Sequence, residues 1–294
     1  MINSNKFGIV ISFFSLWINT KFSADYQQIV GFVVIFLFGI LHGSNDIALY
    51  NKIDNADSSI SLNKVLLYYT SVVLLGVLLF YSIPIVALLL FIIFSGFHFG
   101  EQHWEHLKEK GSENAILLFQ TLYGLFIFSL LFYFHAPEVK ITVSQIIHTS
   151  IDFISFGWTT IIIGLALLIS TIYINHRLEN FKKYIIVNIF YLIVFAIVFK
   201  TADLIWAFAI YFVVWHSIPS IKTQINFLYG DFNFKNFGIY FKSAFPYWII
   251  SLIGIAGLYF LFKDKELFNA LFFSFLAAIT FPHTIIILKM QNRK

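Results

Sequence analysis

Long apolar runs separated by short polar breaks extend along the whole chain, and they predict membrane-crossing helices. A helix needs about 20 mostly apolar residues to cross the hydrocarbon core of a bilayer, and about 17 to 25 are acceptable. The runs cover residues 7–18, 29–50, 64–81, 83–99, 115–134, 157–174, 184–199, 203–218, 245–262 and 267–288. The first run is short enough to lie at the membrane interface instead. We therefore expect an all-α fold, a polytopic transmembrane helical bundle of about eight to ten spans.

The composition agrees with this interpretation. Of the 294 residues, 59% are hydrophobic and 12% are charged, whereas about 25% of the residues in a soluble protein are charged. Too few polar side chains are present to cover a water-facing globule, which excludes nucleic-acid binding and cytosolic enzyme folds. The chain has no cysteine, so disulfides, thiolate metal sites and iron–sulfur clusters are excluded as well. Nine histidines are left as the main chemical groups.

The polar stretches between the runs are interpreted as loops of one integral membrane domain that covers residues 1–294. The longest are 51–63, 100–114, 135–156 and 219–244. Alternating the loops of ten spans leaves five basic residues on one side, namely Lys21, Lys140, Lys200, Lys263 and Lys265, and the other 14 of the 19 on the opposite side. An excess of lysine and arginine marks the cytoplasmic side. We therefore expect a multi-pass protein of the cell inner membrane with both termini in the cytoplasm.

Four histidines fall inside or at the ends of apolar runs, where an ionisable residue is costly and is a functional candidate by default. They are His42, His98, His216 and His283. All four lie on runs that cross from outside to inside in this topology, at depths of about 20 to 24 Å at roughly 1.5 Å per residue. One such histidine would more often be a polar contact between helices. Four at matched depth, from four helices, favour a metal site, and imidazole suits iron, copper or zinc.

Two carboxylates accompany these histidines. Asp46 is four residues after His42, so on a helix it shares that face and can accept the second ring N–H of a ligand histidine. Its alternative role is a helix-end residue that faces cytoplasmic water. Glu101 follows His98 by three residues and Gln102 follows it by four, so either can share the face of His98.

Other histidines and glycines are weaker candidates. His103 is a reserve metal ligand, and the density of HFGEQHWEH, from His98 onward, leaves a second metal position open. His135 and His148 fall in the predicted outer loop and His176 in an inner loop, and we expect these three at the surface. Gly96, close to His98, permits either close backbone approach at the site or ordinary small-residue helix packing.

The motifs together resemble the bacterial beta-carotene 15,15'-dioxygenases of the Brp/Blh family. HGSND at 42–46, FHFGEQHW at 97–104, WHSIPS at 215–220 and PH at 282–283 carry the resemblance, in this order on a multi-pass chain. The family pattern reads His-Gly-x-x-Asp-His, His-Phe-Gly-x-x-Asp and His-x-x-Arg-His. The segments between the motifs match only in hydrophobicity.

The chain departs from the family pattern at four positions, one of which is Pro219 in place of the arginine of the third motif. Ile47 replaces the second histidine of the first motif, and His103 occupies the acidic position of the second. Ser220 stands where the third motif has a histidine that is thought to bind the family's iron. The resemblance therefore leaves the fourth ligand open, and the depth argument nominates His283 for it, with His103 in reserve.

The resemblance implies an iron-dependent enzyme that cleaves beta-carotene at its central double bond with O₂ and yields two retinal molecules. The implied cofactor is Fe(2+), bound by His42, His98 and His216 together with the fourth ligand. The implied partners are a carotenoid substrate from the lipid phase, O₂, membrane lipids and, as a candidate, a rhodopsin that accepts retinal. Asp46 and Glu101 are the carboxylates expected to assist catalysis.

Two other classes stay open at this point. A divergent membrane lipid oxygenase or di-iron desaturase normally carries several tight histidine boxes, and here only His98, His103 and His106 cluster. A non-enzymatic transporter that carries a metal or haem needs only one or two axial histidines. A count of iron per chain and the absorption spectrum of the purified protein distinguish these classes.

Overall fold

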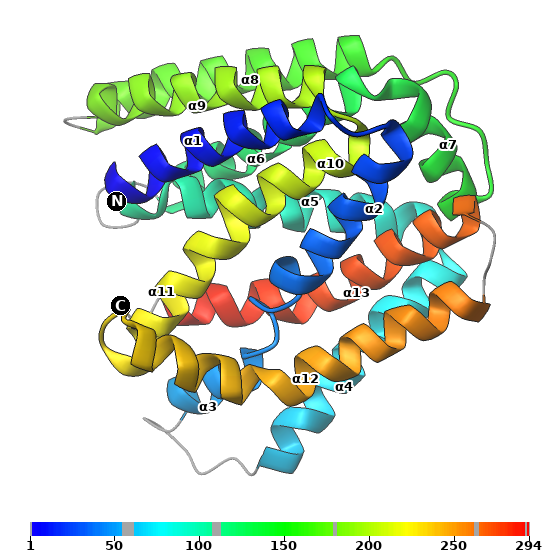
Figure 1. Cartoon of the computed structure of the whole chain (residues 1–294). Helices are drawn as coiled ribbons and strands as arrows, with labels where there is room; N and C mark the ends of the chain where they lie inside the picture. The colour runs from blue at the N-terminus through cyan, green and yellow to red at the C-terminus, as the bar shows by residue number, and fades with distance from the viewer. Residues whose placement is uncertain are drawn as a thin grey trace. The chain divides into compact units, whose positions relative to one another are not determined.

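The computed structural model describes residues 2–54, 62–107, 113–178, 181–261, 265–291 and 293. Within these ranges the chain is helical and has no strand, which confirms the expected all-α fold. The elements labelled in Figure 1, with the short π- and 3-10 helices between them, are α1 (Ile2–Asn19), α2 (Ala24–Val34), the π-helix η1 (Ile35–Gly39), α3 (Asp46–Asp54), α4 (Leu62–Ser82), α5 (Pro84–His103), the 3-10 helix η2 (Glu105–Leu107), α6 (Glu113–Phe134), α7 (Ala136–Ile147), α8 (Phe156–Arg177), α9 (Phe181–Thr201), α10 (Leu204–Ala209), the π-helix η3 (Ile210–Ser217), α11 (Ile218–Tyr229), α12 (Phe234–Leu261) and α13 (Lys265–Gln291).

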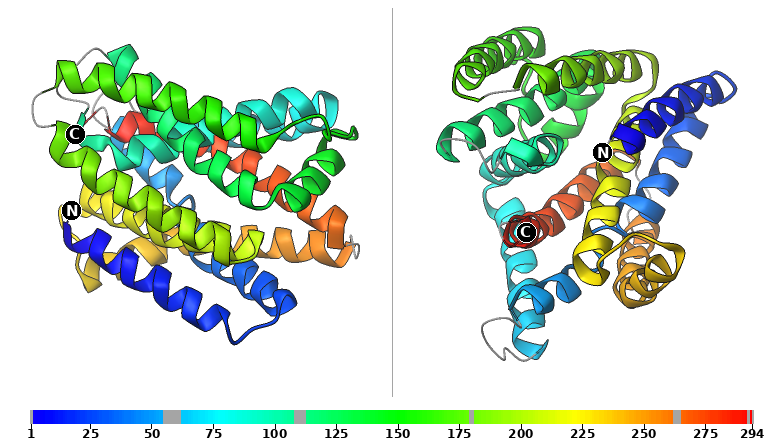
Figure 2. Two further views of the ribbon diagram at one scale, coloured as in Figure 1. Left: turned by 90° about the horizontal axis from the view of Figure 1, so that it is seen from above. Right: turned by 90° about the vertical axis from the view of Figure 1, so that its left-hand side faces the viewer.

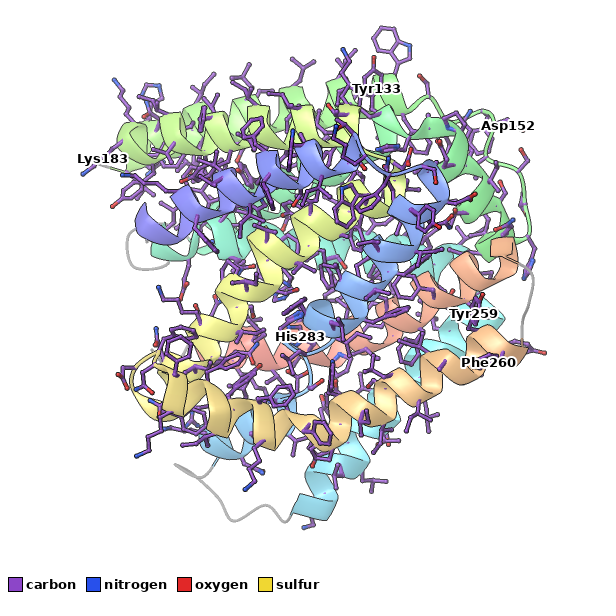
Figure 3. All side chains as sticks on the ribbon, viewed as in Figure 1. Tyr133, Asp152, Lys183, Tyr259, Phe260 and His283 are labelled. Atoms are coloured by element: carbon purple, nitrogen blue, oxygen red, sulfur yellow. The ribbon has the colours of Figure 1, made fainter. Side chains whose placement is uncertain are left out.

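Within the described ranges, seven helical segments are long and apolar enough to cross a membrane: 84–103, 114–134, 156–177, 181–201, 204–229, 234–257 and 274–291. Shorter apolar helices cover 6–19, 24–39 and 66–82. Each of the ten predicted runs overlaps one of these segments. The labelled side chains of Tyr133, Tyr259 and Phe260 in Figure 3 are exposed, as is usual where lipid replaces water as the solvent. The chain is therefore a multi-pass membrane protein.

Three boundaries predicted from the sequence are wrong. The run 29–50 is not one helix, because residues 40–45 form a turn between η1 and α3. Glycines and short polar side chains at Gly43, Ser44 and Asn45 favour turns over helix. The predicted loop 135–156 contains α7, and the predicted loop 219–244 contains α11 and the start of α12. Both α7 and α11 mix polar with apolar residues, and polar residues alone do not distinguish a helix from a loop. Most of the predicted loop 51–63 lies outside the described residues.

The chain forms two compact units, each built from three separate stretches. Unit 1 comprises residues 1–33, 92–141 and 150–216. In it α6 packs against α8 and α9, and α1 runs alongside α9 (Figure 2). Helices α5 and α6 cross at glycines: a Cβ on Gly100 would lie 1.7 Å from the carbonyl oxygen of Gln120, and one on Gly124 would lie 1.8 Å from that of Gly96. Gly96 and Gly100 are therefore explained by helix packing.

Unit 2 comprises residues 34–91, 142–149 and 217–294. Helix α13 packs against α3, α4 and α12, and α11 packs against α3 and α12. The buried core of this unit is formed by Leu41, Leu49, Ile53, Ile221, Ile225, Leu228, Tyr240, Ala244, Ile286, Ile287 and Met290. This core holds the turn 40–45, which carries His42, against α11, α12 and α13.

Candidate metal centre

Unit 2 brings together two of the predicted ligands, His42 and His283. His42 lies in the turn that follows η1, and His283 lies in α13 directly after Pro282. Their ring centroids are 4.7 Å apart with the planes nearly perpendicular, at 87°. Both side chains are buried. A Cβ on Gly43 would lie 3.7 Å from Nδ1 of His283, so the imidazole of α13 lies against the backbone of the turn.

Asp46 lies within hydrogen-bond distance of a ring nitrogen of a candidate ligand histidine, as expected, but that histidine is His283 and not the neighbouring His42. Oδ1 of Asp46 lies 2.7 Å from Nδ1 of His283, while the Tyr69 hydroxyl donates to Oδ2 at 3.2 Å. Only the expected helix face shared with His42 is wrong, because α3 begins at Asp46, so His42 is not on that helix and the spacing of four residues does not apply. Nδ1 of His42 contacts the carbonyl oxygen of Gly39 instead.

Unit 1 brings together the other two predicted ligands, His98 and His216. Their ring centroids are 4.8 Å apart at an interplanar angle of 80°, and both side chains are buried. The ring of Phe99 lies 4.4 Å from that of His216. His98 comes from α5 and His216 from the π-helix η3. Within the described residues, the π-helix η1 precedes the turn that carries His42, and the π-helix η3 contains His216. Turns of π-helix are frequent at functional sites.

Gln102 holds His216 through two hydrogen bonds. Its Oε1 accepts from Nδ1 of His216, and its Nε2 donates to the carbonyl oxygen of His216 at 2.9 Å. The spacing of four residues had placed Gln102 on the face of His98. The contact of Gln102 with η3 could not be predicted from the sequence. A glutamine on a helix does not indicate which neighbouring helix its side chain contacts.

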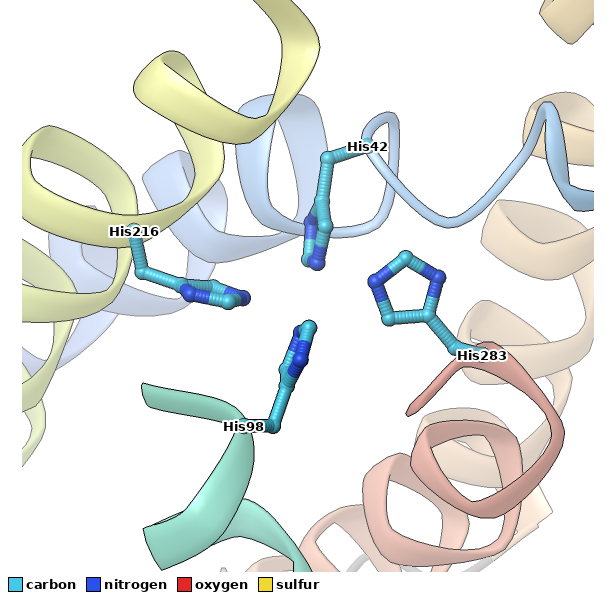
Figure 4. A group of neighbouring side chains, drawn as sticks. All are labelled: His42, His98, His216 and His283. Carbon is cyan, nitrogen blue, oxygen red and sulfur yellow. The ribbon is translucent and has the colours of Figure 1, made fainter. Parts of the chain in front are cut away.

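The hydrogen bonds define the same tautomer in three of the four histidines. In His42, His216 and His283, Nδ1 faces an oxygen that can only accept, so in the neutral form of each ring Nδ1 carries the proton and the lone pair lies on Nε2. A neutral imidazole with its second nitrogen held by a carbonyl or carboxylate is the usual form of a metal ligand. His42, His98, His216 and His283, labelled in Figure 4, are buried histidines that could hold a metal ion, each through one ring nitrogen.

Glu101 and His103 have different surroundings. Glu101 on α5 is fully buried, with 0% of its surface exposed. The ring of His103 lies among aromatic side chains, 5.4 Å from Tyr123 and 5.7 Å from Phe195 between centroids, and its Nε2 lies 3.5 Å from the hydroxyl of Tyr211. Five residues turn an α-helix by about 140° from the face of His98, which explains why the two histidines of α5 have separate neighbours. The side chain of His106 lies outside the described part.

The three histidines expected at the surface differ in their exposure. His148 and His176 are exposed, as predicted. His135 is 7% exposed and that prediction is wrong, because the residue follows the apolar run 115–134 directly and packs with it. Burial lowers the pKa of His135, and the ring hydrogen-bonds to the backbone of Phe199.

A buried polar network around Gln224 was missed by the sequence reasoning. Nε2 of Gln224 donates to the carbonyl oxygen of His42 at 2.9 Å and to Oγ of Ser220 at 3.0 Å. Oε1 of Gln224 accepts from the hydroxyl of Tyr240 at 2.8 Å, and the carbonyl oxygen of Tyr240 accepts from Asn45 at 2.9 Å. Ser220 thus serves this network, which fixes the turn that carries His42.

The helices and the buried histidines define a class, a multi-pass membrane protein with a candidate metal centre. Residues 33–291 match the family described as beta-carotene 15,15'-dioxygenase, and the match includes all four histidines. The chain belongs to this family, which confirms the resemblance seen in the motifs. Searches of curated proteins and of solved structures found no match.

Proposed function

We propose that the protein cleaves the central 15,15' double bond of beta-carotene with O₂ and releases two molecules of retinal. Membership of the beta-carotene 15,15'-dioxygenase family supports the substrate and the reaction. We further propose that a single Fe(2+) is bound by the two histidine pairs together, His42 with His283 and His98 with His216. The observation that carries the metal proposal is the shared tautomer, since three buried imidazoles keep their lone pair on Nε2.

His283 is proposed as the ligand that takes over from the family histidine at the position of Ser220. A neutral serine hydroxyl is a poor ligand for iron beside imidazoles, and Oγ of Ser220 already accepts from Gln224. His283 is buried and its Nδ1 is bound to a carboxylate. A carboxylate behind a histidine orients the ring and raises its basicity as a ligand.

The two buried carboxylates have electrostatic roles in this proposal. Four neutral imidazoles leave the charge of a divalent ion uncompensated, and a nearby anion lowers the energy of the ion in a medium of low dielectric constant. Asp46, behind His283, supplies one negative charge close to the site. Glu101, fully buried one helical turn after His98, supplies the second carboxylate.

The iron would supply open coordination positions for O₂, and the protein's residues would bind and orient the polyene and exclude water. The apolar surroundings of the histidines are suited to a polyene, because the ring centroids of Phe99 and Phe212 lie 4.4 and 5.5 Å from that of His216. A substrate as apolar as a carotenoid arrives through the lipid, so a protein of the cytoplasmic membrane needs no hydrophilic entrance. Retinal is also largely apolar, so it would leave through the lipid. It would then pass to a retinal-binding partner such as a rhodopsin.

Expression in bacteria that accumulate beta-carotene tests the proposed function. The wild-type chain is expected to bleach the cells and to give extractable retinal. His42→Ala, His98→Ala, His216→Ala and His283→Ala are each expected to abolish retinal formation, because each removes a ligand. His148→Ala, at an exposed position, is the matched control and keeps the wild-type yield. Unchanged retinal in any two of the four variants, at equal protein level, would refute the ligand assignment.

A further inference from the structure

Residues 1–32 lie outside the family match, which begins at residue 33. In unit 1 they nevertheless contact the helical segment that leads into His216. The contacts fall at both ends of this segment, at Trp215 next to His216 and at the start of α10. The N-terminal residues are therefore placed to influence a candidate ligand.

The first contact is a buried hydrogen bond between α1 and η3. Nε1 of Trp215 donates to Oγ of Ser12 at 2.8 Å, and the Ser12 hydroxyl donates to the carbonyl oxygen of Gly8 at 2.8 Å. Ser12 is 0% exposed and Trp215 is 5% exposed. A Cβ on Gly8 would lie 3.4 Å from the indole ring, so the ring packs closely against the backbone of α1.

Helix α9 encloses the same indole from another direction. The ring centroids of Tyr191 and Phe195 lie 5.0 and 4.9 Å from that of Trp215. The indole is thus fixed by aromatic contacts to α9 and by one polar contact to α1. The hydrogen bond is the most directional of these contacts, so Ser12 restricts the rotation of the indole within this enclosure.

The second contact secures the other end of the segment. Nε2 of Gln27 donates to the carbonyl oxygens of Phe22 and Asn19 at 3.2 and 3.5 Å, and its Oε1 accepts from the backbone N–H of Asp203 at 3.4 Å. A Cβ on Gly31 would lie 3.2 Å from the backbone of Ile205. The start of α10 is therefore packed closely on α2.

The segment between these contacts needs external support. Residues 210–217 form a π-helix, a geometry that is rare and occurs mostly as single turns inside α-helices. A change from π- to α-helical hydrogen bonding shifts the register of every residue that follows. Contacts at both ends of the segment oppose such a shift and keep His216, its last residue in unit 1, in place.

We propose that α1 and α2 brace η3, and that Ser12 is a positioning residue for His216 through its hydrogen bond to Trp215. This inference rests on the proposed function, because it takes His216 as a metal ligand. Changes to residues that hold a ligand histidine lower metal affinity by about 10- to 100-fold. Ser12 acts one residue further away, so Ser12→Ala is expected to weaken binding by about three- to tenfold.

The test is a titration of the purified full-length apoprotein in detergent with Co²⁺ alone, followed by the visible absorption of the bound ion. Ser12→Ala is expected to raise the dissociation constant about three- to tenfold and to shift the absorption bands, because the position of His216 changes. Ser15→Ala, the same substitution on the same helix, is the control and is expected to match the wild type. A change in overall packing alone would alter the melting temperature without moving the bands.

Trp215→Phe is a second variant that tests the same hydrogen bond if Ser12→Ala folds poorly. It removes the donor and retains an aromatic ring, and the double variant with Ser12→Ala is expected to bind Co²⁺ no more weakly than the weaker single variant. Wild-type affinity and unshifted bands in both single variants would overturn the brace while leaving the proposed function intact. A wild-type chain that binds no Co²⁺ would overturn both.

Discussion

Nδ1 of His283 donates to Oδ1 of Asp46 over 2.7 Å, although 237 residues separate the two along the chain. Asp46 is the first residue of α3, where the positive end of the helix dipole stabilises a carboxylate. Its second oxygen accepts from the hydroxyl of Tyr69. The carboxylate is thus held from two sides, and it fixes the ring of His283 in the tautomer that a metal ligand requires.

Replacing this carboxylate should therefore weaken metal binding without removing a ligand. Asp46→Ala is expected to lower metal affinity by about 10- to 100-fold, as measured by Co²⁺ titration of the apoprotein. Asp46→Asn, which retains an oxygen that can accept from Nδ1, is expected to fall between Asp46→Ala and the wild type. Asp152→Asn, at an exposed position, serves as the control. Wild-type affinity in Asp46→Ala would show that His283 needs no carboxylate to act as a ligand.

Gln102 should act on His216 in the same way. Gln102→Leu removes both hydrogen bonds to that residue, so its ring can rotate, and we expect metal affinity to fall about tenfold or more. Gln102→Glu keeps an acceptor for Nδ1 and should recover part of the loss. The recovery distinguishes positioning of the ring from simple packing, and Gln102→Glu binding more weakly than Gln102→Leu would argue against it.

The crossing of α5 and α6 predicts a large effect on stability. A Cβ on Gly124 would lie 1.8 Å from the carbonyl oxygen of Gly96, so Gly124→Ala forces the helices apart and is expected to destabilise the fold by about 1 to 3 kcal/mol or more. Gly254→Ala in α12 meets nothing within 4 Å and should be neutral or slightly stabilising. Thermal unfolding in detergent measures both, and equal melting temperatures would contradict the close crossing.

His135 provides a variant that separates stability from metal binding. His135→Ala leaves the backbone of Phe199 without its partner and creates a cavity, and we expect a loss of about 1 to 3 kcal/mol of stability. Metal content and retinal yield per folded protein should stay at the wild-type level. A loss of metal comparable with that of His98→Ala would show that the assignment of ligands is incomplete.

The sequence was sufficient for the all-α, membrane-spanning fold class, because the length of an apolar run determines whether a helix can cross a bilayer. Each predicted run overlaps an apolar helix, and the errors lie at segments such as α7 and α11, in which apolar and polar residues are mixed and form no continuous apolar run. The division of the chain into two compact units has no counterpart in the apolar pattern, because each unit combines stretches that are distant in sequence.

The sequence predicted which residues belong to the candidate site, but it did not predict which contacts they make. The cost of an ionisable group in a membrane made His42 and His283 candidates without any knowledge of their neighbours. Which histidine Asp46 contacts depended on whether residues 40–45 form a helix. Glycine and asparagine in this stretch favour a turn, and a turn is what forms. Gln102 and Gln224 gave no signal, because a glutamine acquires its role only from the element that packs against it.

We propose that one iron ion is bound by His42, His98, His216 and His283. This proposal is tested most directly by the iron content of the purified protein, measured by elemental mass spectrometry against the protein concentration. We expect about one iron per chain in the wild type and a large loss of iron in His283→Ala. An iron-free or di-iron wild type, or full iron occupancy in His283→Ala, would contradict the proposal.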